Sequence, residues 1–336
     1  MRRPLRYFFY SIVALVILLA LIAWSGWWWV MQRAVPMNAP TIEYNVEQGM
    51  GPRQIARQMT AAGIALHEDS FVLLARYAET DTNLKAGAYR AEAGDTLWDL
   101  LQRMVTGDML QTRITFVEGW TLAQMLNALA QHPDVRATLT EISPQELAQQ
   151  LNTEVAHPEG LFYPDTYVFA PGTTDLVLLK RAHEAQLDLL EQLWAQRAPD
   201  LPIDSPYEAL ILASIVEKET GHAEDRRRIA GVFMNRLRKG MLLQSDPTVI
   251  YGMGDRYQGR IRKVDLTTDT PWNTYTRPGL PPTPIAAPGK ASLLAVLHPE
   301  EHDYYYFVSR GDGTSEFSKT LREHNRAVAK YILKRN

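Results

Sequence analysis

Residues 213–221 read ASIVEKETG and place two glutamates, Glu217 and Glu219, at the end of an apolar run. At about 100° of rotation per helical residue, Glu219 falls about 80° from Ile211, in the middle of an apolar arc. Glu217 falls about 240° from Ile211, on the opposite side. We therefore expect Glu217 to be solvated or paired, and Glu219 to face the core or the wall of a cleft.

A carboxyl group in the position of Glu219 is suited to general acid catalysis. Apolar surroundings disfavour its ionised form and raise its pKa, and the dipole at a helix C-terminus acts in the same direction. A carboxyl that stays protonated near neutral pH can donate a proton in the cleavage of a glycosidic bond. The alternative is that the helix ends near residue 217 and that Glu219 is an ordinary surface residue. Leu210, at about 260° on the same wheel, makes the apolar face less distinct.

Polar and aromatic residues that could bind sugars follow Glu219 in the sequence. Aromatic rings can stack on sugar rings, and amides can form hydrogen bonds with hydroxyl and N-acetyl groups. For each residue alone, a turn or a helix cap is the alternative, as for the Asp-Pro pair at 246–247. Asp246 is also a candidate second carboxylate, which would permit hydrolysis. The candidate substrate-binding residues are Asn235, Gln244, Ser245, Asp246, Tyr251, Asn273 and Tyr275.

Residues 298–302 read HPEEH and fit the H-x-x-E-H pattern of some zinc peptidases. That chemistry needs both histidines on one face of a helix as zinc ligands. Pro299 interrupts the spacing, and a predicted strand at 304–310, YYYFVSR, begins almost at once. We therefore expect a polar loop here, and we predict no metal site and no cofactor.

The length and composition limit the architecture that positions these residues. A chain of 336 residues suggests two domains, or one large domain with an appendage. With 46% hydrophobic and 22% charged residues, most of it should be globular. A net charge of −3 argues against a nucleic-acid partner, and the absence of cysteine excludes disulfides, thiolate nucleophiles and Cys-ligated zinc.

An apolar N-terminal segment predicts one membrane-spanning helix. Residues 7–31 contain no charged side chain, and about 20 apolar residues suffice to cross a bilayer. Arginines precede this segment and tryptophans cluster at its far end, so the positive-inside rule places the N-terminus in the cytoplasm. A cleaved signal peptide is the alternative, which the length of the segment and the lack of a cleavage site disfavour. We assign residues 1–6 to the cytoplasm, 7–31 to the helix and 32–41 to a linker.

Three similar segments indicate a weak internal repeat. They are YNVEQGMGPRQIARQM (44–59), YRAEAGDTLWDLLQRM (89–104) and ITFVEGWTLAQMLNAL (114–129). Each reads as an extended stretch, a glutamate, a glycine turn and an amphipathic helix, which predicts small strand–turn–helix units. The stretch GDTLWDL also resembles the opening of a LysM glycan-binding module. We therefore predict a small LysM-like αβ domain at 42–155, with a generic strand–helix turn as the alternative.

The remainder of the chain, 156–336, is predicted to be mostly helical, which makes the chain α+β. A loop rich in aromatic residues, proline and glycine begins it, and a Pro/Gly-rich stretch without regular periodicity lies at 241–290. The helices predicted in this remainder are 176–197, 206–240 and 318–334, and a further helix is predicted at 143–156, at the end of the preceding region.

The segments IVEKETGHAEDRRRIAGVFMNRLRKGMLLQSDPTVIYGMG (215–254), WNTYTRPGLPPTPIAAPG (272–289) and EGLFYPDTY (159–167) resemble the YceG-like family of membrane-anchored endolytic peptidoglycan transglycosylases. The motifs are long and occur in the family's order, and with the anchor and the LysM-like region the resemblance covers nearly the full chain. It implies a lysozyme-like catalytic domain at 156–336 that cleaves peptidoglycan glycan strands.

The resemblance also implies a catalytic residue and a reaction. In the wider class the acid is a glutamate at a helix end followed by Ser or Thr, which here is Glu219 followed by Thr220. The carboxyl protonates the oxygen between N-acetylmuramic acid and N-acetylglucosamine, and then acts as a base while the muramoyl C6 hydroxyl closes on C1. The product ends in a 1,6-anhydro ring, and one carboxyl suffices because that hydroxyl replaces the attacking water. Related soluble enzymes more often have Ser after the glutamate, so the role of Thr220 stays open.

These observations predict a single-pass protein of the inner membrane with its catalytic domain in the periplasm. Its expected partners are nascent glycan strands, the membrane and a peptidoglycan synthase, with no nucleic acid. Two alternatives remain. A muramidase would use Glu219 with Asp246 or another acid to hydrolyse the strand, and a non-catalytic scaffold would hold glycan and recruit a synthase.

Overall fold

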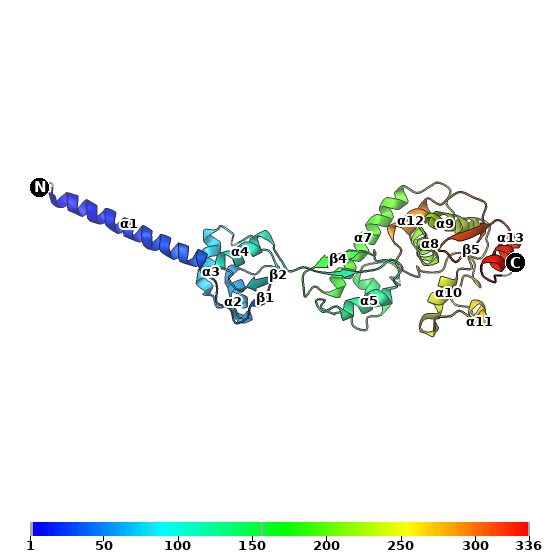
Figure 1. Cartoon of the computed structure of the whole chain (residues 1–336), viewed down its shortest axis with the longest axis horizontal. Helices are drawn as coiled ribbons and strands as arrows, with labels where there is room; N and C mark the ends of the chain where they lie inside the picture. The colour runs from blue at the N-terminus through cyan, green and yellow to red at the C-terminus, as the bar shows by residue number, and fades with distance from the viewer. Residues whose placement is uncertain (1–2, 81, 156, 335–336) are drawn as a thin grey trace. The chain divides into compact units, whose positions relative to one another are not determined.

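A computed structural model of the chain describes residues 3–80, 82–155 and 157–334. The contacts divide the chain into two compact units (Figure 1). The N-terminal unit comprises Met1–Thr112 with Val168–Gly172, and the C-terminal unit comprises Arg113–Tyr167 with Thr173–Asn336. The predicted class is confirmed as mixed α+β and mostly helical, with an apolar N-terminal helix.

The boundary between the units differs from the one expected at 155/156. Residues 113–155 group with the C-terminal unit because hydrogen bonds join them to it. The N–H of Gly119 donates to the carbonyl of Ala287, and the N–H of Ala287 donates to the carbonyl of Trp120. The assignment of a glycan-binding and a catalytic domain stays a prediction.

Helix α1 (Arg3–Gln32) contains the predicted membrane span. Its segment Tyr10–Trp28 has a mean hydropathy of 2.1 and is long and apolar enough to cross a membrane. This helix is consistent with a membrane anchor or with a signal sequence. Residues 1–2 of the predicted cytoplasmic end lie outside the described residues.

The rest of the N-terminal unit is a two-stranded antiparallel sheet packed against helices. Strand β1 alternates exposed and buried residues. Its buried side chains join a core that also contains side chains of the three helices that follow α1 in this unit. Tyr44 pairs with Tyr89 in the register of the sheet. The elements are β1 (Thr41–Val46), α2 (Pro52–Ala62), α3 (Glu68–Tyr77), β2 (Gly87–Glu92) and α4 (Leu97–Thr106).

Each of the three similar segments forms the predicted strand, glycine turn and helix. The third unit is β3 (Thr112–Thr115) followed by α5 (Leu122–Gln131). The turn glycines Gly49, Gly94 and Gly119 have φ values of 85°, 106° and 76°, which residues with a Cβ rarely adopt. The repeat therefore reflects the same local requirement at three places, although its third copy belongs mostly to the C-terminal unit.

The C-terminal unit consists mainly of helices with short strands. Strand β5 pairs with β6, and helix α12 packs against α8 and α9. Strand β3 pairs with β4, and both strands include residues that the division above assigns to the N-terminal unit. The remaining elements are α6 (Pro144–Gln150), β4 (Thr166–Phe169), α7 (Asp175–Ala195), α8 (Pro206–Glu219), α9 (Ala223–Arg238), α10 (Asp246–Met253), a 3₁₀ turn η1 (Gly254–Arg256), α11 (Lys263–Thr267), α12 (Lys290–Leu297), β5 (Tyr306–Ser309), β6 (Ser315–Ser318) and α13 (Leu321–Tyr331).

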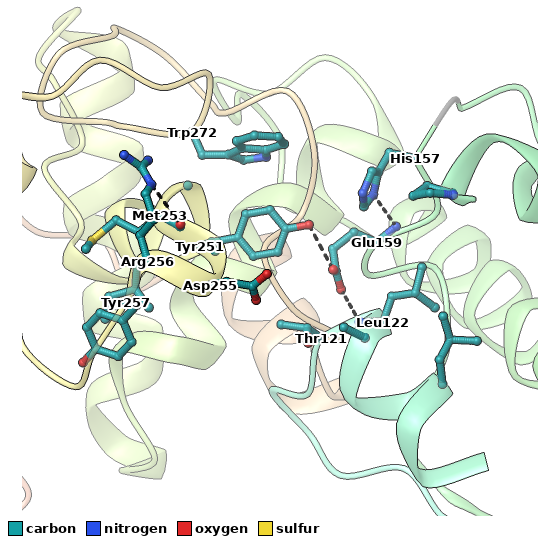
Figure 2. Close-up of a pocket in the computed structure, with 16 residues that line it drawn as sticks. Thr121, Leu122, His157, Glu159, Tyr251, Met253, Asp255, Arg256, Tyr257 and Trp272 are labelled. Atoms are coloured by element: carbon teal, nitrogen blue, oxygen red, sulfur yellow. Dashed lines mark hydrogen bonds between the residues drawn. The ribbon is translucent and has the colours of Figure 1, made fainter. Parts of the chain in front are cut away.

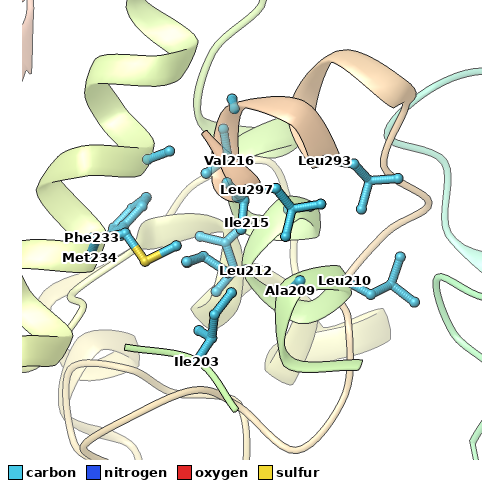
Figure 3. Packing of buried hydrophobic residues seen from close by; sticks show 14 of the residues in the cluster. Ile203, Ala209, Leu210, Leu212, Ile215, Val216, Phe233, Met234, Leu293 and Leu297 are labelled. Carbon is cyan, nitrogen blue, oxygen red and sulfur yellow. The ribbon is translucent and has the colours of Figure 1, made fainter. Parts of the chain in front are cut away.

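Helix α8 runs through the core of this unit. All residues from Ala209 to Val216 are buried, so the helix is enclosed on every side rather than along one stripe. Its side chains contact Phe233 and Met234 of α9 and the leucines of α12 (Figure 3). This explains why Leu210 does not fit a one-sided apolar face: that side is buried too. The packing fixes the C-terminal end of α8, where Glu219 lies.

Candidate active site

Glu219 is the last residue of α8, which excludes the alternative that the helix stops at residue 217. Its carboxyl is partly buried, and Ser245 Oγ donates a hydrogen bond of 2.5 Å to its Oε1. Burial raises the pKa of Glu219 to about 7, and the nearby charge of Asp246 acts in the same direction. The Ser245 hydrogen bond and the positive charge of Arg236 oppose this rise.

Glu217 is paired, as the helical wheel predicted. Its Oε2 accepts a 3.0 Å hydrogen bond from the N–H of Gly289. The neighbouring Lys218 donates through Nζ to the carbonyl of Gly119. The wheel therefore separated the two glutamates correctly: one is bonded to a neighbouring loop, and the other faces Ser245.

The loop before α10 holds Ser245 in place. Ser245 is 2% exposed, and its N–H donates to Thr274 Oγ1. Gln244 has φ 48°, its side chain is exposed, and its N–H donates to the carbonyl of Thr274. Thr274 Oγ1 in turn shares a 2.8 Å hydrogen bond with Thr248 Oγ1. The backbone at residues 244 and 245 is thus held against Thr274, which positions the Ser245 hydroxyl that donates to Glu219.

Arg236 is a site residue that sequence reasoning missed. It is 6% exposed, and its guanidinium donates to the carbonyls of Leu243 and Tyr305, each at 2.7 Å. These bonds join α9 to the loop that carries Ser245 and to the segment before β5. Its charge also stabilises the ionised form of Glu219. Arg236 lies in the basic stretch RLRK (236–239), and the sequence alone does not indicate which of these cations is buried.

Tyr275 and Asp246 are brought together beside Glu219. The Tyr275 hydroxyl donates a 2.6 Å hydrogen bond to Asp246 Oδ1. Asp246 is exposed and is the first residue of α10. Burial raises the pKa of Tyr275 well above its usual range, so it remains a hydrogen-bond donor at neutral pH.

Two predicted substrate-binding residues instead hold loops. Asn273 is fully buried, and its amide nitrogen donates to the carbonyls of Asp265, Leu266 and Thr268 while its Oδ1 accepts the N–H of Tyr275. Asn235 on α9 donates to the carbonyls of His302 and Tyr304. We interpret both side chains as positioning residues, because substrate contact would require breaking these bonds.

The HPEEH segment is a loop, as predicted. Helix α12 ends at Leu297, before the first histidine, and β5 starts at Tyr306. His302 Nε2 lies 2.9 Å from the carbonyl oxygen of Arg228, so this histidine is held against α9. The helical spacing that a zinc peptidase needs is therefore not formed here.

A second feature of this unit is a cleft of about 950 Å³. One wall is the start of α5, and the other is formed by the end of α10, the turn after it and Trp272 (Figure 2). Tyr251 lines this cleft, and its ring lies edge-on to Trp272 at a centroid distance of 5.3 Å. Glu219 is not among the described residues that line it.

Glu159 lies in this cleft and was not singled out from the sequence. It is 3% exposed, and its two carboxylate oxygens accept hydrogen bonds from the N–H of Leu122 at 2.8 Å and the hydroxyl of Tyr251 at 3.0 Å. Burial raises the pKa of Glu159 to about 7, and these bonds limit the rise. The only sequence signal was its place at the start of the EGLFYPDTY segment.

Comparison with known proteins gives consistent matches over most of the chain. Residues 44–330 match the YceG-like family. A protein of Bacillus subtilis (strain 168) named endolytic murein transglycosylase is 31% identical over 313 residues, which cover 88% of this chain and 86% of that protein. One of the same name from Streptococcus pneumoniae serotype 2 (strain D39) is 27% identical over 361 aligned positions, covering 96% of this chain and 65% of that protein.

A solved structure is also similar. The crystal structure of a YceG-like protein from Listeria monocytogenes aligns with a TM-score of 0.55 at 30% sequence identity, covering 85% of this chain and 98% of that one. The family match alone spans well over half of the chain. These comparisons confirm the predicted family: the chain belongs to the YceG-like family.

Proposed function

We propose that this protein is an endolytic murein transglycosylase that uses Glu219 as its single general acid and base. The observation that carries the proposal is the carboxyl of Glu219, held by Ser245 at the end of a buried helix on a residue that is partly exposed, where burial raises its pKa to about 7. The names of the relatives from Bacillus subtilis and Streptococcus pneumoniae support the same activity.

The geometry around Glu219 suits a proton transfer in both directions. The Ser245 hydroxyl engages Oε1 and so restricts rotation of the carboxyl. The protonated carboxyl gives its proton to the oxygen between N-acetylmuramic acid and N-acetylglucosamine as the bond from C1 to that oxygen breaks. The muramoyl C6 hydroxyl then bonds to C1 and returns its proton to the carboxylate, which leaves a 1,6-anhydro end. The Arg236 charge stabilises the carboxylate between the two steps.

Hydrolysis is the second candidate, and the position of Asp246 favours it. This carboxylate is exposed and close enough to raise the pKa of Glu219. In a muramidase it would activate a water molecule on the opposite face of the sugar. The hydrogen bond from Tyr275 occupies Oδ1, so only the other oxygen of Asp246 would be left to engage that water molecule.

We further propose that α1 anchors the chain in the inner membrane, with residues 1–6 in the cytoplasm and everything after α1 in the periplasm. The short connection between α1 and β1 would confine the enzyme to nascent strands near the bilayer, where a peptidoglycan synthase works. The LysM-like region would hold glycan. Sequencing the N-terminus of the mature chain separates an anchor, which is retained, from a signal sequence, which is removed.

The test of the activity uses the full chain and uncrosslinked glycan strands, with the products weighed by mass spectrometry. The proposal predicts products lighter by one water than hydrolytic ends, and their loss in Glu219→Gln. Glu217→Gln is the matched control, because Glu217 lies on the same helix and bonds to Gly289. Hydrated ends would establish the muramidase, and intact strands that remain bound to the wild-type chain would establish the scaffold.

A further inference from the structure

The proposed reaction leaves the cleft around Glu159 without a role. The cleft measures about 950 Å³ and lies within the C-terminal unit. Its described lining contains apolar side chains of α5 on one side and aromatic side chains on the other, together with the acidic residues Glu159 and Asp255 and the basic residue Arg256. Clefts of this size and lining commonly bind a ligand.

Two aromatic side chains of the cleft, Tyr251 and Trp272, are held in place by hydrogen bonds and by contact with each other. The hydroxyl of Tyr251 points across to Glu159, and the ring of Trp272 lies beside that of Tyr251 (Figure 2). Trp272 Nε1 donates a 2.9 Å hydrogen bond to Thr283 Oγ1. Rings fixed in this way lose little entropy when a ligand packs against them. Sugar rings, with one apolar face and polar edges, suit such a surface.

Helix α10 connects the cleft to Glu219. Ser245, which donates to Glu219, directly precedes the helix, and Tyr251 lies near its other end. At 1.5 Å per residue, Tyr251 is roughly 8 Å along the helix axis from Asp246. Ser245 and Tyr251 are thus close together on one short helix, as binding of a single strand at both Glu219 and the cleft would require.

The turn after α10 adds a cation. Arg256 is exposed, and its Nε makes a long hydrogen bond of 3.4 Å to the carbonyl of Met253. The peptide stems on peptidoglycan carry carboxylates, which a guanidinium binds well. The lining also contains two carboxylates. The oxygens of Glu159 are engaged by Leu122 and Tyr251, whereas the exposed Asp255 directly precedes Arg256 and offsets its charge, so the guanidinium would act through direct contact with a stem carboxylate.

We propose that this cleft is a subsite for the glycan strand, and that it holds sugar residues beyond the bond cut at Glu219. The inference rests on the proposed function and deepens it. Binding on one side of the scissile bond favours cutting within a strand rather than at its end, because a terminal unit would leave the cleft empty. Binding energy from this remote part of the substrate contributes to the rate of cleavage.

The test fills the cleft without removing any contact. Ala123 is an exposed residue of α5 that lines the cleft, and Ala123→Trp places a bulky side chain into it. Ala130 is an exposed alanine on nearly the same face, seven residues farther along α5 and outside the cleft lining, so Ala130→Trp is the matched control. Full-length variants are assayed on long glycan strands and on a tetrasaccharide that spans little more than the scissile bond.

We expect Ala123→Trp to raise KM for long strands roughly tenfold while its turnover of the tetrasaccharide matches wild type. Ala130→Trp should match wild type on both substrates. Equal KM values for long strands in both variants would overturn the subsite and leave the proposed activity standing. Absence of cleavage by the wild-type chain on either substrate would instead overturn the proposed function and, with it, this inference.

Discussion

Two glutamates near opposite ends of α10 have the same raised pKa, about 7, in different surroundings. Glu219 is partly exposed and accepts one side-chain hydrogen bond, from Ser245. Glu159 is 3% exposed, and both of its oxygens are engaged by Leu122 and Tyr251. The comparison teaches that a raised pKa marks burial, whereas catalysis also needs access to the substrate.

The largest expected difference between the two glutamates is in the rate of cleavage. Glu219→Gln removes the transferable proton and should lower kcat by about 10³-fold, within the range that general acids contribute. Glu159→Gln keeps the shape of the cleft and should lower kcat/KM by no more than about tenfold. Initial rates of strand cleavage measure both. A greater loss in Glu159→Gln than in Glu219→Gln would reverse our assignment.

The next prediction concerns how the free energy of unfolding depends on pH through the ionisation of Glu159. Its pKa is raised from 4.5 to about 7, so the folded chain keeps a proton that the unfolded chain loses between these values. The contribution of this group to stability therefore falls as the pH rises from about 4.5 through 7, by on the order of 3 kcal/mol. In Glu159→Gln, this fall in stability with rising pH should be absent.

Unfolding of the full chain by denaturant at pH 5 and pH 8 measures this effect. The variant should be near wild type at pH 5 and more stable than wild type at pH 8. Tyr251→Phe is the counterpart, because it removes a hydrogen bond to the ionised carboxylate and should steepen the loss with pH. Equal pH dependence in wild type and Glu159→Gln would show that Glu159 ionises normally.

A smaller effect is expected from Ser245→Ala at the other end of α10. The Ser245 hydroxyl lowers the pKa of Glu219 by stabilising its ionised form. Without it, that pKa should rise by about one unit, and the alkaline limb of the kcat/KM profile should move to higher pH. A limb that moves to lower pH would mean that Ser245 stabilises the protonated form instead.

The smallest expected effect is a decrease in the pKa of Glu219, opposite in sign to the effect of Ser245→Ala. Asp246→Asn removes a negative charge that raises the pKa of Glu219, so the alkaline limb should move to lower pH by less than one unit. Asparagine can still accept the hydrogen bond from Tyr275. Retained cleavage with this shift is the expected result, whereas complete loss of cleavage would identify Asp246 as the second carboxylate of a hydrolase.

The sequence predicted the parts of the site that depend on local geometry. The helical wheel separated Glu217 from Glu219, and the three glycine turns followed from their repeated pattern. Both depend on residues close together in the chain. The predicted helices at 176–197 and 318–334 correspond to α7 and α13 for the same reason.

The parts that were missed depend on long-range contacts. Glu159 forms hydrogen bonds with partners 37 and 92 positions away in the chain. The residues next to it in the sequence do not indicate these partners. The Pro/Gly-rich stretch 241–290, in which the sequence shows no regular periodicity, contains the short helices α10 and α11. The buried amide of Asn273 holds carbonyl groups of α11 and its end, a contact that no periodicity reveals.

The most direct test of the central claim is cleavage of uncrosslinked strands by the full chain in water enriched in oxygen-18. If Glu219 acts with the muramoyl C6 hydroxyl, the new 1,6-anhydro ends contain no labelled oxygen, and Glu219→Gln forms no such ends. One labelled oxygen at each new reducing end would contradict the account and make the protein a hydrolase.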